Sequence, residues 1–190
     1  MKVVTAIDDY AVQGTDILCF LAGGITKCWE WQDKVIESLG HYPCTDRLVV
    51  FNPRRKNFPI DDPNASYEQI KWEFKWLERC DIFSMYFAES ESVQPICMYE
   101  LGRNIVRMQN RFPTSYQDRI VVSCEEGYSR INDVQIQIGL ALGGIETITK
   151  HIDNFKLTSL STLSPNTRGH AMKIAYRYYS LTDLKSLLNK

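Results

Sequence analysis

The feature that most constrains the fold of this sequence is a repeated alternation between short apolar runs and segments with helical spacing. The runs cover residues 17–22, 48–51, 81–87 and 119–124. Apolar residues at successive positions are typical of strands that are buried on both faces of a parallel sheet. Because helical segments alternate with these strands, the sequence predicts an α/β fold. We expect a compact, doubly wound, mostly parallel sheet of about five strands, with helices on both faces.

Two of the helical segments have an inward face that consists of apolar residues at a spacing of three or four. The expected inward residues are Cys28, Trp31, Val35, Ile36 and Leu39 in one segment and Cys97, Leu101, Ile105 and Met108 in the other. Gly40 is predicted to end the first helix, and Pro95 is predicted to lie in the first turn of the second.

The helical segment between these two has a possible start signal. Ser66 and Gln69 resemble a capping box, in which each side chain satisfies a free N–H group of the first turn. If the helix starts there, its apolar spacing places Ile70, Phe74 and Leu77 on the inward face.

Beyond the fourth apolar run, the pattern predicts a helix over residues 131–142 and a short fifth strand over 145–148. A C-terminal helical extension is expected over about 166–190. We therefore predict a single domain over residues 1–190, with its motifs within 16–142.

Composition and charge narrow the functions that this domain can have. Lys and Arg number 22 and Asp and Glu number 23, so the net charge of −1 favours neither a nucleic-acid polymer nor a membrane as partner. No apolar run approaches the ~20 residues of a membrane span, and the first residues do not resemble a signal peptide. The six cysteines form no C-x-x-C pair. They predict free thiols in a reducing cytoplasm, and no metal or cofactor is expected.

Ligands of parallel α/β sheets bind beyond the carboxyl ends of the strands, so the loops after the apolar runs form the candidate site. Gly23 and Gly24 follow the first run, and a helix is predicted from about Thr26. This arrangement either lets backbone N–H groups approach an anionic ligand or is only a tight turn. Arg54 and Arg55 follow the second run. They either clamp a phosphate or carboxylate or are solvated loop residues.

Two pairs of polar residues are candidates for the chemistry. Gln69 and Glu73 are four residues apart and share a helix face, from which they can read a base or ribose hydroxyls. The alternative is a capping amide and a surface acid. Glu100 lies among apolar residues near the start of a helix, and Asp81 begins the third apolar run. They are either functional acids, with Glu100 partly desolvated, or a dipole-favoured acid and a strand cap.

Six short motifs occur in an order that resembles the nucleoside 2-deoxyribosyltransferase superfamily. They are Phe20-Leu21-Ala22-Gly23-Gly24-Ile25, Phe51-Asn52-Pro53-Arg54-Arg55, Gln69-Ile70-Lys71-Trp72-Glu73, Cys80-Asp81-Ile82-Phe83, Tyr99-Glu100-Leu101-Gly102 and Gly127-Tyr128-Ser129-Arg130. The second and third are similar to the Asn-Pro-Arg-Arg and Q-x-x-W-E elements of one branch. The resemblance covers roughly residues 16–142 and implies a compact parallel α/β domain.

The resemblance implies an enzyme that cleaves the N-glycosidic bond of a (deoxy)nucleoside or nucleoside 5′-monophosphate. Glu100 would attack the anomeric carbon, Asp81 would orient the substrate or move a proton, and a second base or water would resolve the glycosyl-enzyme. Phe20, Tyr86 and Phe87 would either enclose the base or be core residues. The ligands would be a nucleoside or nucleotide and a free base, and the protein would be a homo-oligomer. The residues expected to bind substrate are Gly23, Gly24, Asn52, Arg54, Arg55, Gln69, Glu73, Gln94, Tyr128 and Arg130.

Gln94 is the main departure from the family pattern. Many members carry a second acid a few residues before the nucleophile, where this sequence has Gln94, with Glu91 in the preceding loop. Because Gln94 cannot act as an acid, transfer to a base and hydrolysis both stay open. One alternative function is a non-catalytic binding module for a nucleotide-derived ligand. Another is an interaction subunit with Tyr176, Tyr178 and Tyr179 at its interface.

Overall fold

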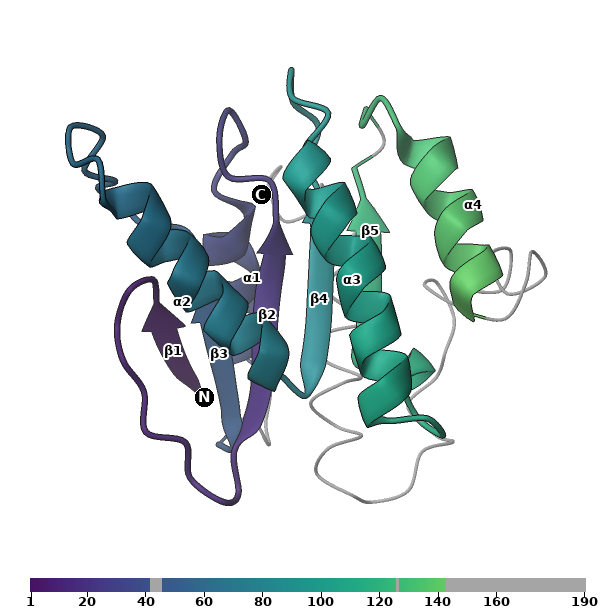
Figure 1. Ribbon diagram of the computed structural model, residues 1–190, viewed down its shortest axis with the longest axis horizontal. Helices are drawn as coiled ribbons and strands as arrows, with labels where there is room; N and C mark the ends of the chain where they lie inside the picture. Colours follow the sequence, from purple (N-terminus) through teal and green to yellow (C-terminus); the bar gives the residue numbers. More distant parts are fainter. Residues whose placement is uncertain (42–45, 126, 143–190) are drawn as a thin grey trace.

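The computed structural model of the chain describes residues 1–41, 46–125 and 127–142, and its centre is a five-stranded sheet (Figure 1). The order of the strands is β1-β3-β2-β4-β5, and every neighbouring pair is parallel. The strands are β1 (Lys2–Thr5), β2 (Ile17–Gly23), β3 (Leu48–Asn52), β4 (Ile82–Phe87) and β5 (Ile120–Cys124). This architecture confirms the predicted α/β fold with a mostly parallel sheet.

The fifth strand of the described sheet is β1, which was not among the predicted strands. It is a short edge strand beside β3, and only Val4 of its residues is buried. A strand with one buried residue lacks the continuous apolar run that marks the other four. The strand predicted over 145–148 lies outside the described residues, as do the C-terminal extension and the three tyrosines that were considered for an interface.

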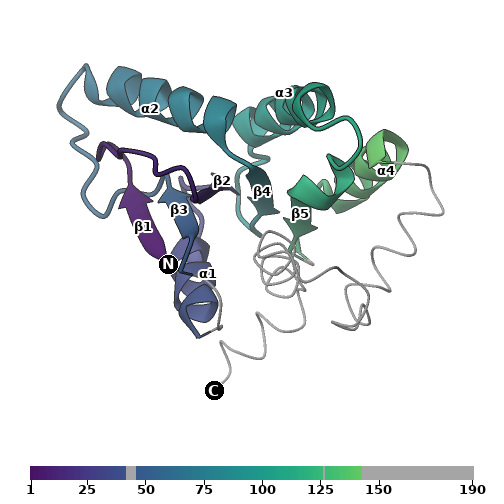
Figure 2. The same cartoon turned by 90° about the horizontal axis from the view of Figure 1, so that it is seen from below.

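The helices cover both faces of the sheet, as predicted (Figure 2). Helices α2 (Ala65–Arg79), α3 (Pro95–Arg111) and α4 (Ile131–Leu142) contribute buried residues to one core, and α1 (Trp31–Gly40) contributes to the core on the opposite face. The inward face predicted for α3 is confirmed, because all of its expected residues are buried. In α1, Trp31, Val35 and Leu39 are buried as predicted, whereas Ile36 is half-buried and Cys28 precedes the start of the helix. Stacking of Phe51 on Trp76, with ring centroids 4.1 Å apart, joins the sheet to α2.

The inward face predicted for α2 is largely wrong. Ile70 and Phe74 are 63% and 55% exposed, whereas Trp72 and Trp76 fill the space against the sheet; only Leu77 is buried as predicted. The two indole rings bury more apolar area than Ile70 and Phe74 would, and this sets the rotation of the helix.

The predicted capping box is also absent from the start of α2. Asn64 is at the N-cap and makes no capping hydrogen bond with its side chain, and Ser66 is already inside the helix. The amide of Gln69 is instead directed away from the helix start, toward Pro53 and Glu73.

Within the described ranges, no helix is both long enough and apolar enough to cross a lipid bilayer. The described cysteines are all buried free thiols.

Candidate active site

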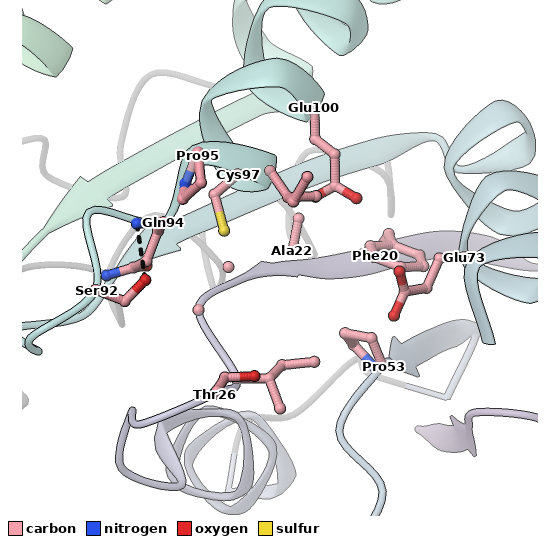
Figure 3. Close-up of a pocket in the computed structure, with 14 residues that line it drawn as sticks. Phe20, Ala22, Thr26, Pro53, Glu73, Ser92, Gln94, Pro95, Cys97 and Glu100 are labelled. Carbon is pink, nitrogen blue, oxygen red and sulfur yellow. Dashed lines mark hydrogen bonds between the residues drawn. The ribbon is translucent and has the colours of Figure 1, made fainter. Parts of the chain in front are cut away.

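A cleft lies at the carboxyl ends of β2 and β4, where the direction of the strand order reverses. The chain passes from β2 to β3 on one side and then crosses to β4 on the other side of β2, and ligands of doubly wound sheets bind at such a switch point. The cleft has a volume of about 210 Å³ (Figure 3). It is lined by Phe20, Ala22, Gly23, Gly24, Ile25, Thr26, Pro53, Glu73, Ser92, Gln94, Pro95, Ile96, Cys97 and Glu100.

Glu100 reaches the cleft from the first turns of α3, which starts at Pro95 as predicted. Burial raises the pKa of the Glu100 carboxyl to about 7, and the nearby Glu73 carboxylate adds to this rise, whereas Arg103 opposes it. An acid with a pKa near neutrality can exist as a carboxylate or as a carboxylic acid at the pH of a cell. Glu100 is therefore suited to nucleophilic or acid–base chemistry.

Glu73 is the second acid of the cleft. Figure 3 shows its carboxylate and that of Glu100 directed into the same part of the cleft, near Phe20. Gln69, one turn earlier in α2, donates a hydrogen bond to Glu73 Oε1 at 2.9 Å, so the two residues share a helix face as predicted. Burial raises the pKa of Glu73, and this hydrogen bond opposes the rise.

Asp81 is not part of this cleft. It precedes the first residue of β4 and so lies at the amino edge of the sheet, where the strands begin. Glu100 lies at the carboxyl edge, where the strands end. Its Oδ2 accepts a hydrogen bond from the Leu18 N–H at 3.0 Å, and its own N–H donates to the Leu18 carbonyl at 2.8 Å. Its Oδ1 pairs with Arg111 at 3.4 Å. These contacts favour the alternative of a strand-start residue over the predicted catalytic role.

Gly23, the last residue of β2, and Gly24 are needed for close packing. A side chain at Gly23, whose φ is +148°, would collide with the Tyr86 carbonyl and with Trp31, and one at Gly24 would collide with Gln94. The helix predicted from about Thr26 starts only at Trp31, so residues 24–30 form a loop. The turn alternative therefore describes these glycines better than a helix start that binds an anion.

Arg54 holds this loop in place. Its Nε donates to Gln32 Oε1 at 2.8 Å, and its Nη2 donates to the carbonyl oxygens of Ile25, Cys28 and Trp29 at 3.2, 3.1 and 2.9 Å. The guanidinium is thus directed at the protein's own main chain and does not line the cleft. Support of a loop, rather than binding of a phosphate, is the role that these contacts favour.

The two neighbours of the Arg54 motif also lie outside the cleft. The Asn52 side chain is buried and accepts a hydrogen bond from the Arg54 N–H at 2.9 Å. Arg55 lies over the Phe58 ring, 5.4 Å from its centroid. Together with Arg54, both residues line a separate hollow beside β1.

Gln94 lies where the loop after β4 enters α3 and lines the cleft as predicted. It adopts a left-handed backbone conformation, and its Nε2 donates to the Ala88 carbonyl at 2.7 Å. Its Oε1 is enclosed and has no hydrogen-bond partner among the described residues. Glu91, the other candidate in this loop, forms an exposed ion pair with Lys27. Gln94 therefore shapes the loop beside Glu100.

Tyr128 and Arg130 do not reach the cleft. The Tyr128 hydroxyl donates to the Val93 carbonyl at 2.9 Å, and its ring stacks on Phe87. Arg130 is exposed and pairs with Asp133 at 2.6 Å. Of the aromatic residues expected to enclose a base, Phe20 lines the cleft, whereas Tyr86 and Phe87 are buried in the two cores.

Two residues at this edge of the sheet were not among the predicted site residues, although the loop that begins at Glu125 was expected here. Cys97, expected only as a core residue, presents its thiol to the cleft (Figure 3). Glu125, the first residue after β5, is buried and joins two loops, because its Oε2 accepts hydrogen bonds from Trp29 Nε1 and the Glu89 N–H. A single acid directly after an apolar run was the only signal of Glu125 in the sequence.

Comparison with known proteins assigns the family. Residues 16–112 match the model of a family described as nucleoside 2-deoxyribosyltransferase like, and a search of curated proteins found no match. The matched range is about half of the chain and includes β2, β3, β4 and the cleft acids Glu73 and Glu100. The matched range thus contains both acids of the cleft. The chain belongs to the nucleoside 2-deoxyribosyltransferase-like family.

Proposed function

We propose that this protein cleaves the N-glycosidic bond of a nucleoside, with Glu100 as the nucleophile. The observation that carries the proposal is the pair of half-buried carboxyls, Glu73 and Glu100, that face the same cleft at the switch point of the sheet. Enzymes that break glycosidic bonds through a covalent intermediate use two carboxyls at the reaction centre. Family membership supports the same class of reaction.

The reaction would proceed in two displacements at the anomeric carbon. In the first, a carboxylate oxygen of Glu100 forms a bond to that carbon, the bond to the base nitrogen breaks, and the base keeps the electron pair and takes a proton from solvent. In the second, water or a ring nitrogen of another base attacks the same carbon and releases the Glu100 carboxylate. The proton lost by the attacking group goes to solvent. The active form of the enzyme therefore requires ionised Glu100.

Glu73, in place of Asp81, would be the second reacting carboxyl. The hydrogen bond from Gln69 favours its ionised form. A fixed negative charge near the anomeric carbon would stabilise the positive charge that develops as the bond to the base breaks. The active form therefore has both carboxyls ionised.

We infer that the preferred substrates are nucleosides rather than 5′-monophosphates. Two carboxylates in a small cleft repel a phosphate, and the Arg54 guanidinium is occupied by three loop carbonyls. The volume of about 210 Å³ lies below the roughly 300–1,000 Å³ of pockets for drug-sized ligands, which fits a ligand of about one nucleoside. Arg54→Ala should destabilise the protein without changing the preference between nucleoside and monophosphate. A selective loss of monophosphate turnover would contradict this inference.

The experiment that tests the proposal is a chromatographic screen for base release from nucleosides and their monophosphates, with and without a second free base. A new nucleoside in the presence of the second base identifies transfer, and release without exchange identifies hydrolysis. Glu100→Ala and Glu100→Gln should both abolish release. Undiminished turnover by either folded variant would exclude Glu100 as the nucleophile.

A non-catalytic binding module is the second candidate function, and Gln94 is the observation that favours it. Gln94 lines the cleft close to Glu100 and cannot donate a proton as a carboxylic acid would. A binding module would show thermal stabilisation by nucleosides without product. Glu100→Gln would then bind the same nucleosides with unchanged affinity.

We also propose that the protein is a homo-oligomer that uses the outer face of α2 and α3. These helices lie on the same face of the sheet (Figure 2), and Ile70, Phe74, Tyr99 and Val106 on them are all more than half exposed. Exposed apolar patches are typical of interfaces between subunits, and these four side chains are the candidates for such a patch. Light scattering should show a dimer or larger assembly that Ile70→Asp dissociates. A monomeric wild-type protein would contradict the proposal.

A further inference from the structure

Gln69 connects the Glu73 carboxylate to the main chain at the end of β3. Its Nε2 donates one hydrogen bond to Glu73 Oε1 and another to the Pro53 carbonyl oxygen, both at 2.9 Å. The side chain is buried, and both acceptors belong to residues that line the cleft. An amide nitrogen has two hydrogens, so both are used and the orientation of the amide is fixed.

This arrangement distinguishes the two oxygens of Glu73. Oε1 is occupied by Gln69, so Oε2 is the oxygen that remains for a ligand. We propose that Gln69 is a positioning residue, which holds the Glu73 carboxylate in its ionised form with Oε2 available to the sugar. The inference rests on the proposed function of the cleft, and it assigns a task to the first residue of the Q-x-x-W-E motif.

The charges around the pair explain why such a residue is needed. Glu73 faces Glu100 across the cleft, and on the side of α3 the other ionisable groups are Arg103 and the Cys97 thiol. Burial opposes ionisation of both acids, and the Glu73 carboxylate further opposes ionisation of Glu100. The Gln69 hydrogen bond acts in the opposite direction on Glu73. Without it, the pair would retain its protons to a higher pH.

Gln69→Leu is the first test, because leucine is of similar size and lacks the donor. Since the reaction needs both carboxyls ionised, kcat/KM should fall roughly 10- to 100-fold, the effect of one hydrogen bond to a charged group. The acidic limb of the pH profile should move to higher pH. Gln32→Leu is the matched control, because Gln32 is also buried but accepts its hydrogen bond from Arg54. This control should lower thermal stability and leave the acidic limb in place.

A double-mutant cycle separates positioning from general damage to the fold. If Gln69 acts through Glu73, then Gln69→Leu should cause almost no further loss of kcat/KM in a Glu73→Gln background. An equal loss in both backgrounds would overturn the proposal. An acidic limb that stays in place in Gln69→Leu would do the same.

A titration without substrate makes the outcome independent of activity. Carbon NMR of labelled glutamate carboxyls, assigned with Glu73→Gln and Glu100→Gln, reports protonation of the pair in the folded protein. Gln69→Leu should raise the pH at which the pair loses its protons, and an unchanged titration refutes the positioning role. If the titration shifts but the wild-type protein releases no base from any nucleoside, it is the proposed function that fails.

Discussion

Acidic residues lie at both edges of the sheet, and their surroundings differ. At the carboxyl edge, Glu73 and Glu100 face each other across a cleft, and burial raises the pKa of both. At the amino edge, Asp81 accepts a main-chain hydrogen bond from β2 and pairs with Arg111 of α3. The hydrogen bonds of Asp81 tie it to the main chain of the sheet, whereas Glu100, which shares its cleft with a second acid, can change protonation near neutral pH. The first arrangement stabilises the fold, and the second provides reactivity.

The largest expected effect is the difference in activity between these two edges. Glu100→Gln should lower base release at least about 1,000-fold, because the nucleophile is lost. Asp81→Ala should leave the rate per folded molecule nearly unchanged, since Asp81 is remote from the cleft. Rates normalised to folded protein, measured by chromatography, would test this contrast. Comparable losses in the two variants would remove the distinction between the edges.

The two substitutions should also act on stability in opposite directions. The pKa of Glu100 is raised from its ordinary value of 4.5 to about 7, so the folded state holds this proton more tightly than the unfolded chain. Wild-type stability should therefore fall between these two pH values, on the order of 1–3 kcal/mol. Glu100→Gln should remove that fall. Asp81→Ala should cost about 1–3 kcal/mol, since the Leu18 N–H loses a charged acceptor.

Urea denaturation at pH 5 and pH 8 measures both effects. The loss of stability from pH 5 to pH 8 should be larger for the wild-type protein than for the Glu100→Gln variant. If the two proteins had the same dependence on pH, Glu100 would not have the raised pKa that its burial implies.

Removal of the Glu73 charge should have a smaller effect, which is a shift in the pH profile of kcat/KM. Glu73→Gln takes away a negative charge that raises the pKa of Glu100. The acidic limb of the residual activity should therefore move to lower pH, although burial, the larger cause, keeps the Glu100 pKa above its ordinary value. A profile of kcat/KM against pH for the variant and the wild type checks the direction. A limb that moved to higher pH would show that the two acids do not repel each other.

The smallest effect is expected at the partner of Asp81. Arg111 is 40% exposed and its ion pair with Asp81 is long, at 3.4 Å, although the same side chain also donates to the carbonyl oxygens of Arg79 and Cys80. Arg111→Met should cost only about 1 kcal/mol, because solvent screens the pair. Denaturant unfolding should place this variant between the wild type and Asp81→Ala. If Arg111→Met were the more damaging of the two, the contacts of Arg111, which include the Arg79 and Cys80 carbonyls, would contribute more to stability than the main-chain hydrogen bond of Asp81.

The parts of the structure that follow from local pattern were predictable. Four strands were evident as continuous apolar runs, and the start of α3 was evident from Pro95. The rotation of α2 was not, because Ile70 and Trp72 are both apolar and only packing against the sheet decides which is buried. Strand β1 was missed because an edge strand buries too little to produce a recognisable pattern.

For the cleft, the sequence identified the polar residues but not how they are grouped. Asp81 is eight residues from Glu73 and begins an apolar run, which already placed it at the amino end of a strand; its catalytic role was implied only by the family resemblance. The role of Arg54 depended on three carbonyls that are 25 to 29 residues earlier in the chain. Long-range hydrogen bonds of this kind arise only from the fold.

The contacts of Arg54 have a consequence for the order of folding. Three carbonyls of the loop after β2 find their partner on a residue that follows β3. The loop cannot acquire its final shape until β3 has joined β2 in the sheet. We therefore expect the turn at Gly23 and Gly24 to be one of the last parts of the molecule to order. During refolding, the ability to bind a nucleoside should then appear after the sheet has formed.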